Sequence, residues 1–578
     1  MIDFLKVYIG ISGILTCLSF NSLNINAQQR WSGNTSPDYV ELISFLDSAA
    51  QENPEIELYS MGQSDYGLPI YVCVVNGSRD SIRTFEKARN ETTVLINNAI
   101  HPGEPDGINA MLIWLEEIVK NGANWNEMPV VAFIPAYNVG GMMNRSSNSR
   151  VNQNGPLEYG FRGNAQNLDL NRDFIKMDSK NAFTFTKIFH ALDPDIFIDN
   201  HVSNGADYQY TLTYISNLEN RLAPSLRKIT HESLLPDLKK AIKSNYSLGL
   251  FPYVDLVGKT PDQGIVSFND LPRYSMGYAA LFQTIGFTVE THMLKPFPLR
   301  VRATYAFMDE IIKWTVTHKE LIEDSRELAR QYTSSNPKFK YNYIRVKDSN
   351  DSIMFKGYEH SFPKHKITGL KRLKYDSSAP YDRYIPNFNV FHPMDTVQVP
   401  EYYYIGRQEK DVIKRLKANK VKMSKIESDT SLSLGVFRVV DFEASNKPYE
   451  GHFQLKNLKI EKGNKLVKLK RGDWKIYCHQ ENALFIHSVL QPEAEDSYLI
   501  WNFFDSYLQH KEYFSSYVFV DKIGEILKQD PELKKKYKAK LKEDSSFRSS
   551  EWDQLYYIYK NSPYFEQTYS ILPVYYQD

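Results

Sequence analysis

Residues 92–104 read TTVLINNAIHPGE, a short apolar run that ends in a His-Pro-Gly-Glu turn. The run at 92–100 has charged residues before it and Pro-Gly after it, which is typical of a buried strand. Apolar residues then recur at helical spacing over 108–119, and an Asn-Gly pair predicts the end of that helix. The stretch therefore predicts a strand, a tight turn and an amphipathic helix, with His101 and Glu104 in the turn.

The same alternation continues to about residue 334. Further strands are predicted at 130–135, 195–199 and 287–290, and helices at 183–192 and, as one long helix, at 300–331. Strands that alternate with helices predict an α/β fold, here a mixed parallel and antiparallel twisted sheet flanked by helices. Ligands of such folds gather at the carboxyl ends of strands, where His101, His201 and Glu290 all fall.

The residue types at these strand ends indicate metal-assisted hydrolysis. One His and one Glu three residues apart (His101 and Glu104), joined by the distant His201, supply three ligands that a catalytic Zn²⁺ takes. Such a site keeps its fourth position for water. Glu290 ends an apolar strand, where burying a carboxylate costs free energy unless the carboxylate is paired or has a catalytic role. Glu290 is therefore a candidate general base.

A third motif supplies positive charge. The sequence DLNRDF begins at Asp169 and contains Asn171 and Arg172. An Arg in a cleft that excludes water binds a carboxylate through paired hydrogen bonds, and an Asn adds hydrogen-bond donors. An Asn-Arg pair by itself is equally typical of a surface loop, so its weight comes from the other motifs.

Together the four ordered motifs resemble the zinc carboxypeptidase family typified by carboxypeptidase A, over roughly residues 36–331. The resemblance implies one Zn²⁺ per chain, bound by His101, Glu104 and His201. It implies that Asp169 orients His101 from behind. The segment THMLKP at 291–296 is similar to a bacterial, extracytoplasmic branch of the family.

The resemblance also assigns the substrate side. Asn171 and Arg172 would hold the terminal carboxylate of a peptide, and Glu290 would act as general base toward the metal-activated water. An upstream Arg would polarise the scissile carbonyl; Arg162 is the best candidate, with Arg145 and Arg150 as rivals. The substrate-capping Tyr has no secure counterpart, and Tyr274 and Tyr278 are both candidates. His292 has either a structural role or a contact near the site.

The leading hypothesis is an exported zinc metallocarboxypeptidase that acts on peptides or peptide-like substrates with a free carboxylate. The alternatives are a zinc amidohydrolase of cell-wall peptides or N-acyl amino acids, and an inactive binding module. Loss of Glu290 or of a metal ligand would mark the inactive module, and none of these residues is missing. Lys+Arg and Asp+Glu are equal at 69 each, so no net charge favours nucleic acid as a partner.

The N-terminus carries a predicted export signal. Lys6 precedes an apolar stretch at 7–20, and Asn26-Ala27-Gln28 follows, which predicts a secretory signal peptide over residues 1–27. The apolar stretch is too short to span a membrane, so no transmembrane segment is expected after cleavage. We expect a periplasmic or secreted protein; a lipid anchor at Cys17 is the less favoured alternative. Cys73 and Cys478 lie in apolar runs and are predicted to be buried free thiols.

The expected organisation is a catalytic domain at 28–334, a β-rich accessory domain at 335–491 and a helical, aromatic segment at 492–578. Gly463-Asn464 is predicted to form a hairpin turn, and one helix is predicted near 411–419. The basic run at 534–542 is predicted to be a solvated helix face. The accessory region either packs on the catalytic domain or binds a polymer through exposed aromatics such as Tyr402, Tyr403 and Tyr404.

Overall fold

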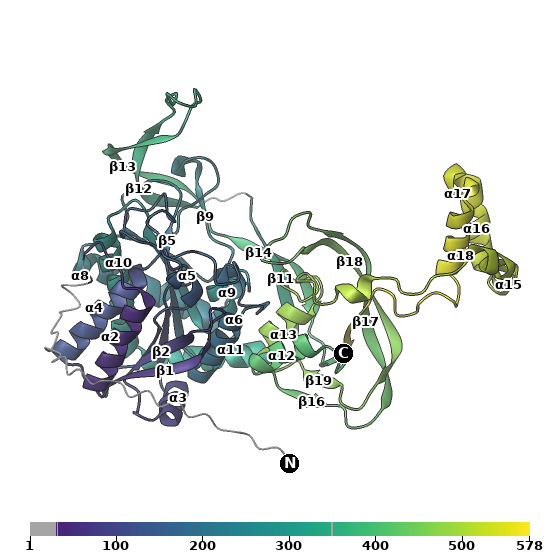
Figure 1. The fold of residues 1–578 in the computed structure, drawn as a ribbon, viewed down its shortest axis with the longest axis horizontal. Coiled ribbons are helices and arrows are strands. Elements are labelled where there is room, and N and C mark those ends of the chain that lie inside the picture. The colour runs from purple at the N-terminus through teal and green to yellow at the C-terminus, as the bar shows by residue number, and fades with distance from the viewer. Residues whose placement is uncertain (1–30, 32, 348–350) are drawn as a thin grey trace, which may run out of the picture.

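The computed structural model describes residues 31, 33–347 and 351–578. Its centre is an eight-stranded sheet in the order β1-β2-β4-β3-β5-β10-β6-β7 (Figure 1). Strands β4, β3, β5 and β10 run parallel to one another in this series, whereas β1–β2, β2–β4 and β10–β6 are antiparallel pairs. The predicted mixed α/β sheet is confirmed. Its strands are β1 (Ile56–Gln63), β2 (Pro69–Val75), β3 (Thr93–Asn97), β4 (Val130–Ile134), β5 (Ile196–Ser203), β6 (Leu212–Ser216), β7 (Leu250–Pro252) and β10 (Ile285–His292).

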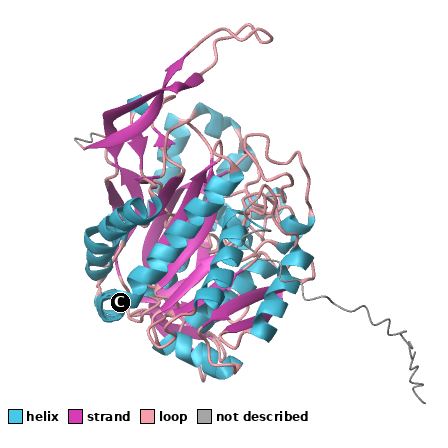
Figure 2. Cartoon of the chain, turned by 90° about the vertical axis from the view of Figure 1, so that its left-hand side faces the viewer, coloured by secondary structure: helices cyan, strands magenta, loops and turns pink. Residues whose placement is uncertain are grey.

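Helices cover both faces of the sheet (Figure 2). Phe197 of β5 packs on Phe185 of α6 (Lys180–Leu192), while Asn200 contacts Met308 of α10 (Phe297–Thr317). Successive side chains of a strand point to opposite faces, so α6 and α10 lie on opposite sides. The other helices of this part are α2 (Tyr39–Glu52), α3 (Ser81–Asn90), α4 (Asp106–Asn121), α5 (Val139–Met143), α7 (Pro224–Lys228), α8 (Leu235–Tyr246) and α9 (Ser275–Ala280).

The single long helix expected at 300–331 is wrong. The structure has two helices, α10 and α11 (Lys319–Ser335), which meet at His318. His318 has φ −128° and ψ 23°, outside the helical region, and its ring stacks on Trp314 at 4.1 Å. The apolar periodicity continues through this break, because both helices have a buried side, and the break itself leaves no signal in the spacing.

Three further sheets are built largely from residues after 335. Strands β11 (Lys338–Arg345) and β14 (Phe391–Gln398) form a pair. Strands β12 (Ser352–Ser361) and β13 (Lys374–Phe388) form a long hairpin, and β13 also pairs with β9 (Ile265–Val266), which pairs with β8 (Asp255–Leu256).

The largest of these sheets has six strands in the order β16-β19-β15-β20-β17-β18. They are β15 (Tyr402–Ile405), β16 (Met423–Lys425), β17 (Thr430–Ala444), β18 (Leu455–Leu469), β19 (Trp474–Tyr477) and β20 (Ile571–Gln577). Helix α13 (Ala483–Leu490) follows β19. Strands from both sides of residue 491 share this sheet, and the domain boundaries stay predictions.

The structure confirms some local predictions in this region and corrects others. The helix near 411–419 is present as α12 (Lys410–Ala418). Gly463-Asn464 is not a turn, because both residues lie inside β18 and pair with β17; the connection between the two strands is at 445–454. Tyr403 and Tyr404 are buried, at 1% and 2% exposure, so they form no exposed aromatic surface. Cys73 and Cys478 are buried free thiols, as predicted.

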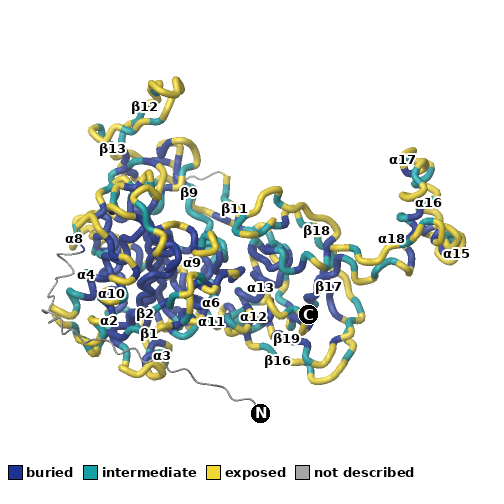
Figure 3. Tube along the Cα trace, viewed as in Figure 1, coloured by how far each residue is buried: buried dark blue, intermediate teal, exposed yellow. Residues whose placement is uncertain are grey.

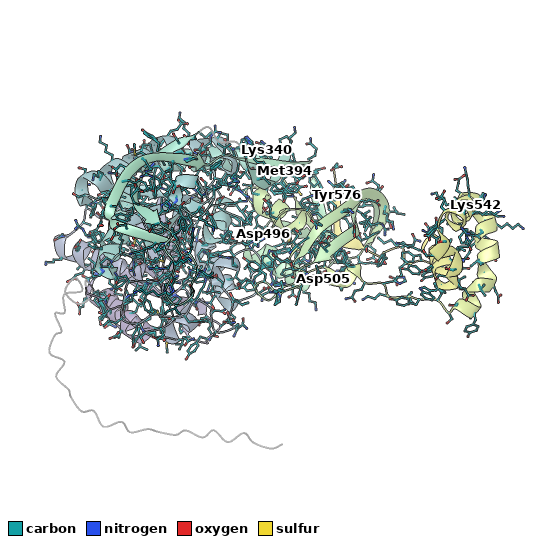
Figure 4. All side chains as sticks on the ribbon, turned by 90° about the horizontal axis from the view of Figure 1, so that it is seen from above. Lys340, Met394, Asp496, Asp505, Lys542 and Tyr576 are labelled. Atoms are coloured by element: carbon teal, nitrogen blue, oxygen red, sulfur yellow. The ribbon has the colours of Figure 1, made fainter. Side chains whose placement is uncertain are left out.

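The helices near the C-terminus form an arm that projects from the rest of the chain (Figures 1 and 4). They are α14 (Ser516–Phe519), α15 (Ile523–Gln529), α16 (Pro531–Glu543), α17 (Ser545–Ser549) and α18 (Glu551–Lys560). They enclose a small core of their own around Phe519, Leu533 and Ile558. Most lysines of α16 are exposed, and Lys542 marks this arm in Figure 4. No helix among the described residues is long and apolar enough to cross a membrane, and the predicted signal peptide at 1–27 lies outside them.

Candidate metal centre

The turn after β3 brings His101 and Glu104 together. The backbone N–H of Glu104 donates to the carbonyl of His101 at 2.8 Å, which closes the turn. Gly103 is needed in between, because a Cβ there would lie 2.9 Å from the carbonyl oxygen of Gly160. Helix α4 begins at Asp106, directly after the turn. The sequence pattern of strand, turn and helix is therefore confirmed.

Three donor side chains converge at this turn. Nδ1 of His101 lies 3.4 Å and Nδ1 of His201 lies 3.1 Å from the same oxygen, Oε2 of Glu104. One potential ligand atom from each of these residues lies within 4.8 Å of the other two, and all three residues are buried. Strand β5 pairs in parallel with β3 as far as Asp199, opposite Asn97, and His201 comes two residues later. The parallel pairing of the two strands therefore brings His201 to the turn.

Each imidazole is held from behind by a carboxylate. Nε2 of His101 lies 2.9 Å from Oδ1 of Asp169, and Nε2 of His201 lies 2.9 Å from Oδ2 of Asp199. Because each Nε2–H donates to its carboxylate, each Nδ1 atom has a free lone pair, which faces Glu104. Histidines that bind metals have this second hydrogen bond almost always. Two imidazole nitrogens and one carboxylate oxygen are a donor set that zinc takes, and their spacing fits one ion.

The electrostatics favour a cation at the same point. Burial by itself would lower the pKa of His201, but the carboxylates of Asp199 and Glu104 outweigh it and raise that pKa well above its usual range. Burial would raise the pKa of Glu104, yet Arg150 and His101 hold it well below its usual range. These carboxylates draw a proton onto His201, and a metal ion can take that proton's place.

Glu290 lies next to these residues on the adjoining strand. In the parallel pair of β10 and β5 it stands opposite His201. Removal from water, helped by the charge of Glu104, raises the pKa of Glu290 to about 8, while His201 and Arg162 oppose that rise. A cation between the three donors would favour the ionised form of this carboxylate. Glu290 lines the same cavity as the donors, a space of about 360 Å³.

Two of the three candidate arginines reach this cavity. Nη2 of Arg150 lies 2.7 Å and Nη1 of Arg162 lies 3.8 Å from Oε1 of Glu104. Nε of Arg162 also donates to Asp169 at 2.9 Å. Arg145 is directed elsewhere and donates to the carbonyls of Ser36 and Pro37.

Asn171, Arg172 and Tyr274 also line this cavity. The Arg172 guanidinium lies 4.6 Å from the centre of the Tyr274 ring, and Oδ1 of Asn171 accepts from the backbone N–H of Ser275 at 3.3 Å. Tyr278 is in the core instead, where its hydroxyl donates to Asn419 at 2.6 Å. His292 is also buried, stacked on Tyr208 at 4.0 Å.

A model of a known protein family matches part of the chain. Residues 42–195, which include His101, Glu104 and the motif at 169–172, match the family model described as zinc carboxypeptidase. The zinc carboxypeptidase domain that the four motifs predicted is therefore confirmed over this segment.

The named relatives of this chain are distant. It is 21% identical to Carboxypeptidase 2 of Trichophyton rubrum over 489 residues, which is 81% of this chain and 84% of that protein. Carboxypeptidase 2 of Trichophyton tonsurans is also 21% identical, over 497 residues and the same shares of the two chains. Among solved structures, carboxypeptidase A of Helicoverpa armigera is 14% identical, with a TM-score of 0.37 over 52% of this chain and 75% of that one. A putative carboxypeptidase A of Shewanella denitrificans OS-217 is 16% identical, with a TM-score of 0.36 over 50% and 69%.

Two contacts at this candidate metal centre were missed by sequence reasoning. Asp199 holds His201, and it also accepts from the hydroxyl of Ser275 on α9. The sequence could have predicted the contact between Asp199 and His201, because residues two positions apart on one strand lie on the same face. The second contact is Glu450, whose carboxylate accepts from the backbone N–H of Asp169. No local pattern relates these two residues, which are 281 positions apart.

Proposed function

We propose that this zinc carboxypeptidase is exported and removes C-terminal residues from peptides. His101, Glu104 and His201 would hold the zinc ion. When bound, zinc supplies a Lewis acid that polarises the scissile carbonyl and acidifies a water molecule. The observation that carries the proposal is the convergence of both Nδ1 atoms on one oxygen of Glu104, with Glu290 beside His201.

The remaining steps belong to side chains of this chain. Glu290 accepts the proton of the attacking water and returns it to the leaving amine. Arg162 donates to the carbonyl oxygen as it gains charge, with Arg150 as its rival for this role. Asn171 and Arg172 bind the terminal carboxylate, and Tyr274 closes over the bound residue. All of these side chains line one cavity, which supports the assignment.

The proposed domain roles and location follow from the sequence. Residues 28–334 would carry the catalysis, followed by an accessory region at 335–491 and the segment at 492–578. The signal peptide at 1–27 would direct export to the periplasm or the medium. N-terminal sequencing of the mature protein tests this, since a chain that starts at Gln28 supports cleavage and one that keeps Met1 contradicts it.

A peptide library followed by mass spectrometry tests the activity. We expect stepwise loss of C-terminal residues from the wild type, and a fall in kcat of roughly 10²–10⁴-fold for Glu290→Gln with zinc content unchanged. His201→Ala should lose bound zinc, which metal analysis measures directly. Normal turnover by Glu290→Gln would remove Glu290 as the base. No cleavage by the zinc-loaded wild type would favour the amidohydrolase alternative.

A further inference from the structure

The hairpin of β12 and β13 stands out from the catalytic part of the chain (Figures 1 and 3). Its base is fixed there, because Gly357 bridges to Tyr208 and the side chain of Gln209 donates to the carbonyls of Gly357 and Tyr381. Phe355 packs in a small core at this base. Beyond Gly357 the paired strands continue for roughly 13 Å. Residues 362–373, which join the two strands, are called the hairpin apex below.

The hairpin apex has a defined backbone. Lys364 bridges to Lys371, and the N–H of His365 donates to the carbonyl of Leu370 at 2.9 Å. The N–H of Gly369 donates to the carbonyl of His365 at 2.9 Å. Gly369 has φ +71°, a left-handed conformation that glycine adopts without strain. These bonds close a small loop and leave most of its side chains exposed.

The composition of the hairpin apex is unusual for a solvated loop. It reads FPKHKITGLKRL, with four cations and one His and no carboxylate. None of the four cations has an ion-pair partner among the residues that the structure describes. Apolar side chains share the loop with them: Ile367 is 90% exposed, Leu370 71% and Phe362 41%.

The acidic groups on the strands next to the apex do not cancel this charge. Glu359 and Asp376 face each other across the ladder. Glu359 is paired with Arg383, and Asp376 interacts with the charge of Lys374, which lies outside the apex. The free positive charge is thus concentrated at the outermost part of the hairpin, together with the exposed Ile367 and Leu370.

We propose that the hairpin apex docks onto an anionic lipid bilayer. Apolar side chains that are exposed between cations match an interface in which Ile367 and Leu370 enter the acyl boundary and the cations stay at the headgroups. An acidic peptide would engage the charges but leave Ile367 and Leu370 in water, so the lipid surface accounts for both features. Because the base of the hairpin is joined to the catalytic part at Tyr208, docking would hold the metal centre close to the bilayer.

Sedimentation with vesicles tests the proposal. The mature protein is mixed with vesicles of phosphatidylcholine alone or of phosphatidylcholine with phosphatidylglycerol, at low and at high salt. We expect binding to the anionic vesicles only, weakened by salt. Ile367→Ser with Leu370→Ser should weaken binding about tenfold or more, because two apolar side chains no longer leave water. Reversal of Lys364, Lys366, Lys371 and Arg372 to Glu should abolish it.

The basic face of α16 supplies a matched control. Reversal of Lys534, Lys535, Lys538 and Lys542 to Glu changes the same number of charges on an exposed surface of the arm. This variant should keep its vesicle binding. The proposal would be overturned if this control variant lost as much vesicle binding as the apex variant. It would also be overturned if the wild type bound no vesicles, or if it bound polyglutamate in place of vesicles. Unchanged cleavage of a soluble peptide confirms that each variant is folded, and vesicle binding does not depend on that activity.

Discussion

Oε2 of Glu450 accepts a hydrogen bond from the backbone N–H of Asp169 at 2.7 Å. Asp169 in turn holds His101 and Arg162 through its two carboxylate oxygens. Glu450 sits in the connection between β17 and β18, and it has φ +49°, beside Gly451 with φ +83°. A tight turn of the C-terminal region therefore supports the loop that carries Asn171 and Arg172.

Removal of that support should weaken substrate binding. Glu450→Ala leaves the N–H of Asp169 without its charged acceptor, a contact of about 1.5–3 kcal/mol. We expect KM to rise roughly tenfold with zinc content unchanged, as measured by steady-state kinetics on a peptide. Glu450→Gln keeps an acceptor oxygen, so its KM should rise much less than that of Glu450→Ala. Equal kinetics in both variants and the wild type would contradict this role.

Asp199 should tune the metal affinity from behind His201. Asp199→Asn removes the charge that fixes the imidazole, and loss of such a partner weakens metal binding about 10–100-fold. Competition with a chromophoric chelator measures the zinc Kd. Asp324→Asn, at an exposed position of α11, serves as the control. An unchanged Kd in Asp199→Asn would show that the hydrogen bond to His201 has no influence on the ion.

The three arginines can be separated by one series of variants. Arg162→Ala should lower kcat by roughly 10²–10³-fold if it stabilises the developing oxyanion. Arg145→Ala should have little effect on kcat, because Arg145 donates to the carbonyls of Ser36 and Pro37. A larger fall for Arg150→Ala than for Arg162→Ala would transfer the role to Arg150.

The contact between Asp178 and His452 predicts a pH dependence of stability. Burial raises the pKa of Asp178, but the hydrogen bond from His452 at 2.7 Å and the charge of Lys176 bring that pKa down to about 2. A folded-state pKa below the unfolded value of 3.8 stabilises the fold above that value, and this stabilisation is lost as the pH falls through the folded pKa. The full loss amounts to about 2 kcal/mol.

Denaturant unfolding at about pH 5 and about pH 2.5 measures this effect, since most of the loss falls between these values. The difference in the free energy of unfolding between the two pH values should shrink by about 1.5 kcal/mol in Asp178→Asn. An identical difference in wild type and variant would show that Asp178 does not titrate with folding.

Much of the part of the chain around the eight-stranded sheet could be predicted from the sequence. The places of His101, His201 and Glu290, at or near the carboxyl ends of strands, follow from apolar runs, and the sheet agrees with them. Two features could not be predicted: the break at His318 and the continuous strand through Gly463. Apolar periodicity depends on which side chains are buried, and it does not change when the backbone angles of one residue change. The burial of Tyr403 and Tyr404 depends on packing partners that are distant in sequence.

The sequence alone determined the donor types, their order and their places near strand ends, since local periodicity and turn chemistry act over a few residues. Only the tertiary structure decided that both Nδ1 atoms face one oxygen of Glu104, that Arg150 joins Arg162 in the cavity, and that Glu450 supports Asp169. These contacts join residues far apart along the chain, and their geometry depends on how whole sheets pack, which no short pattern records.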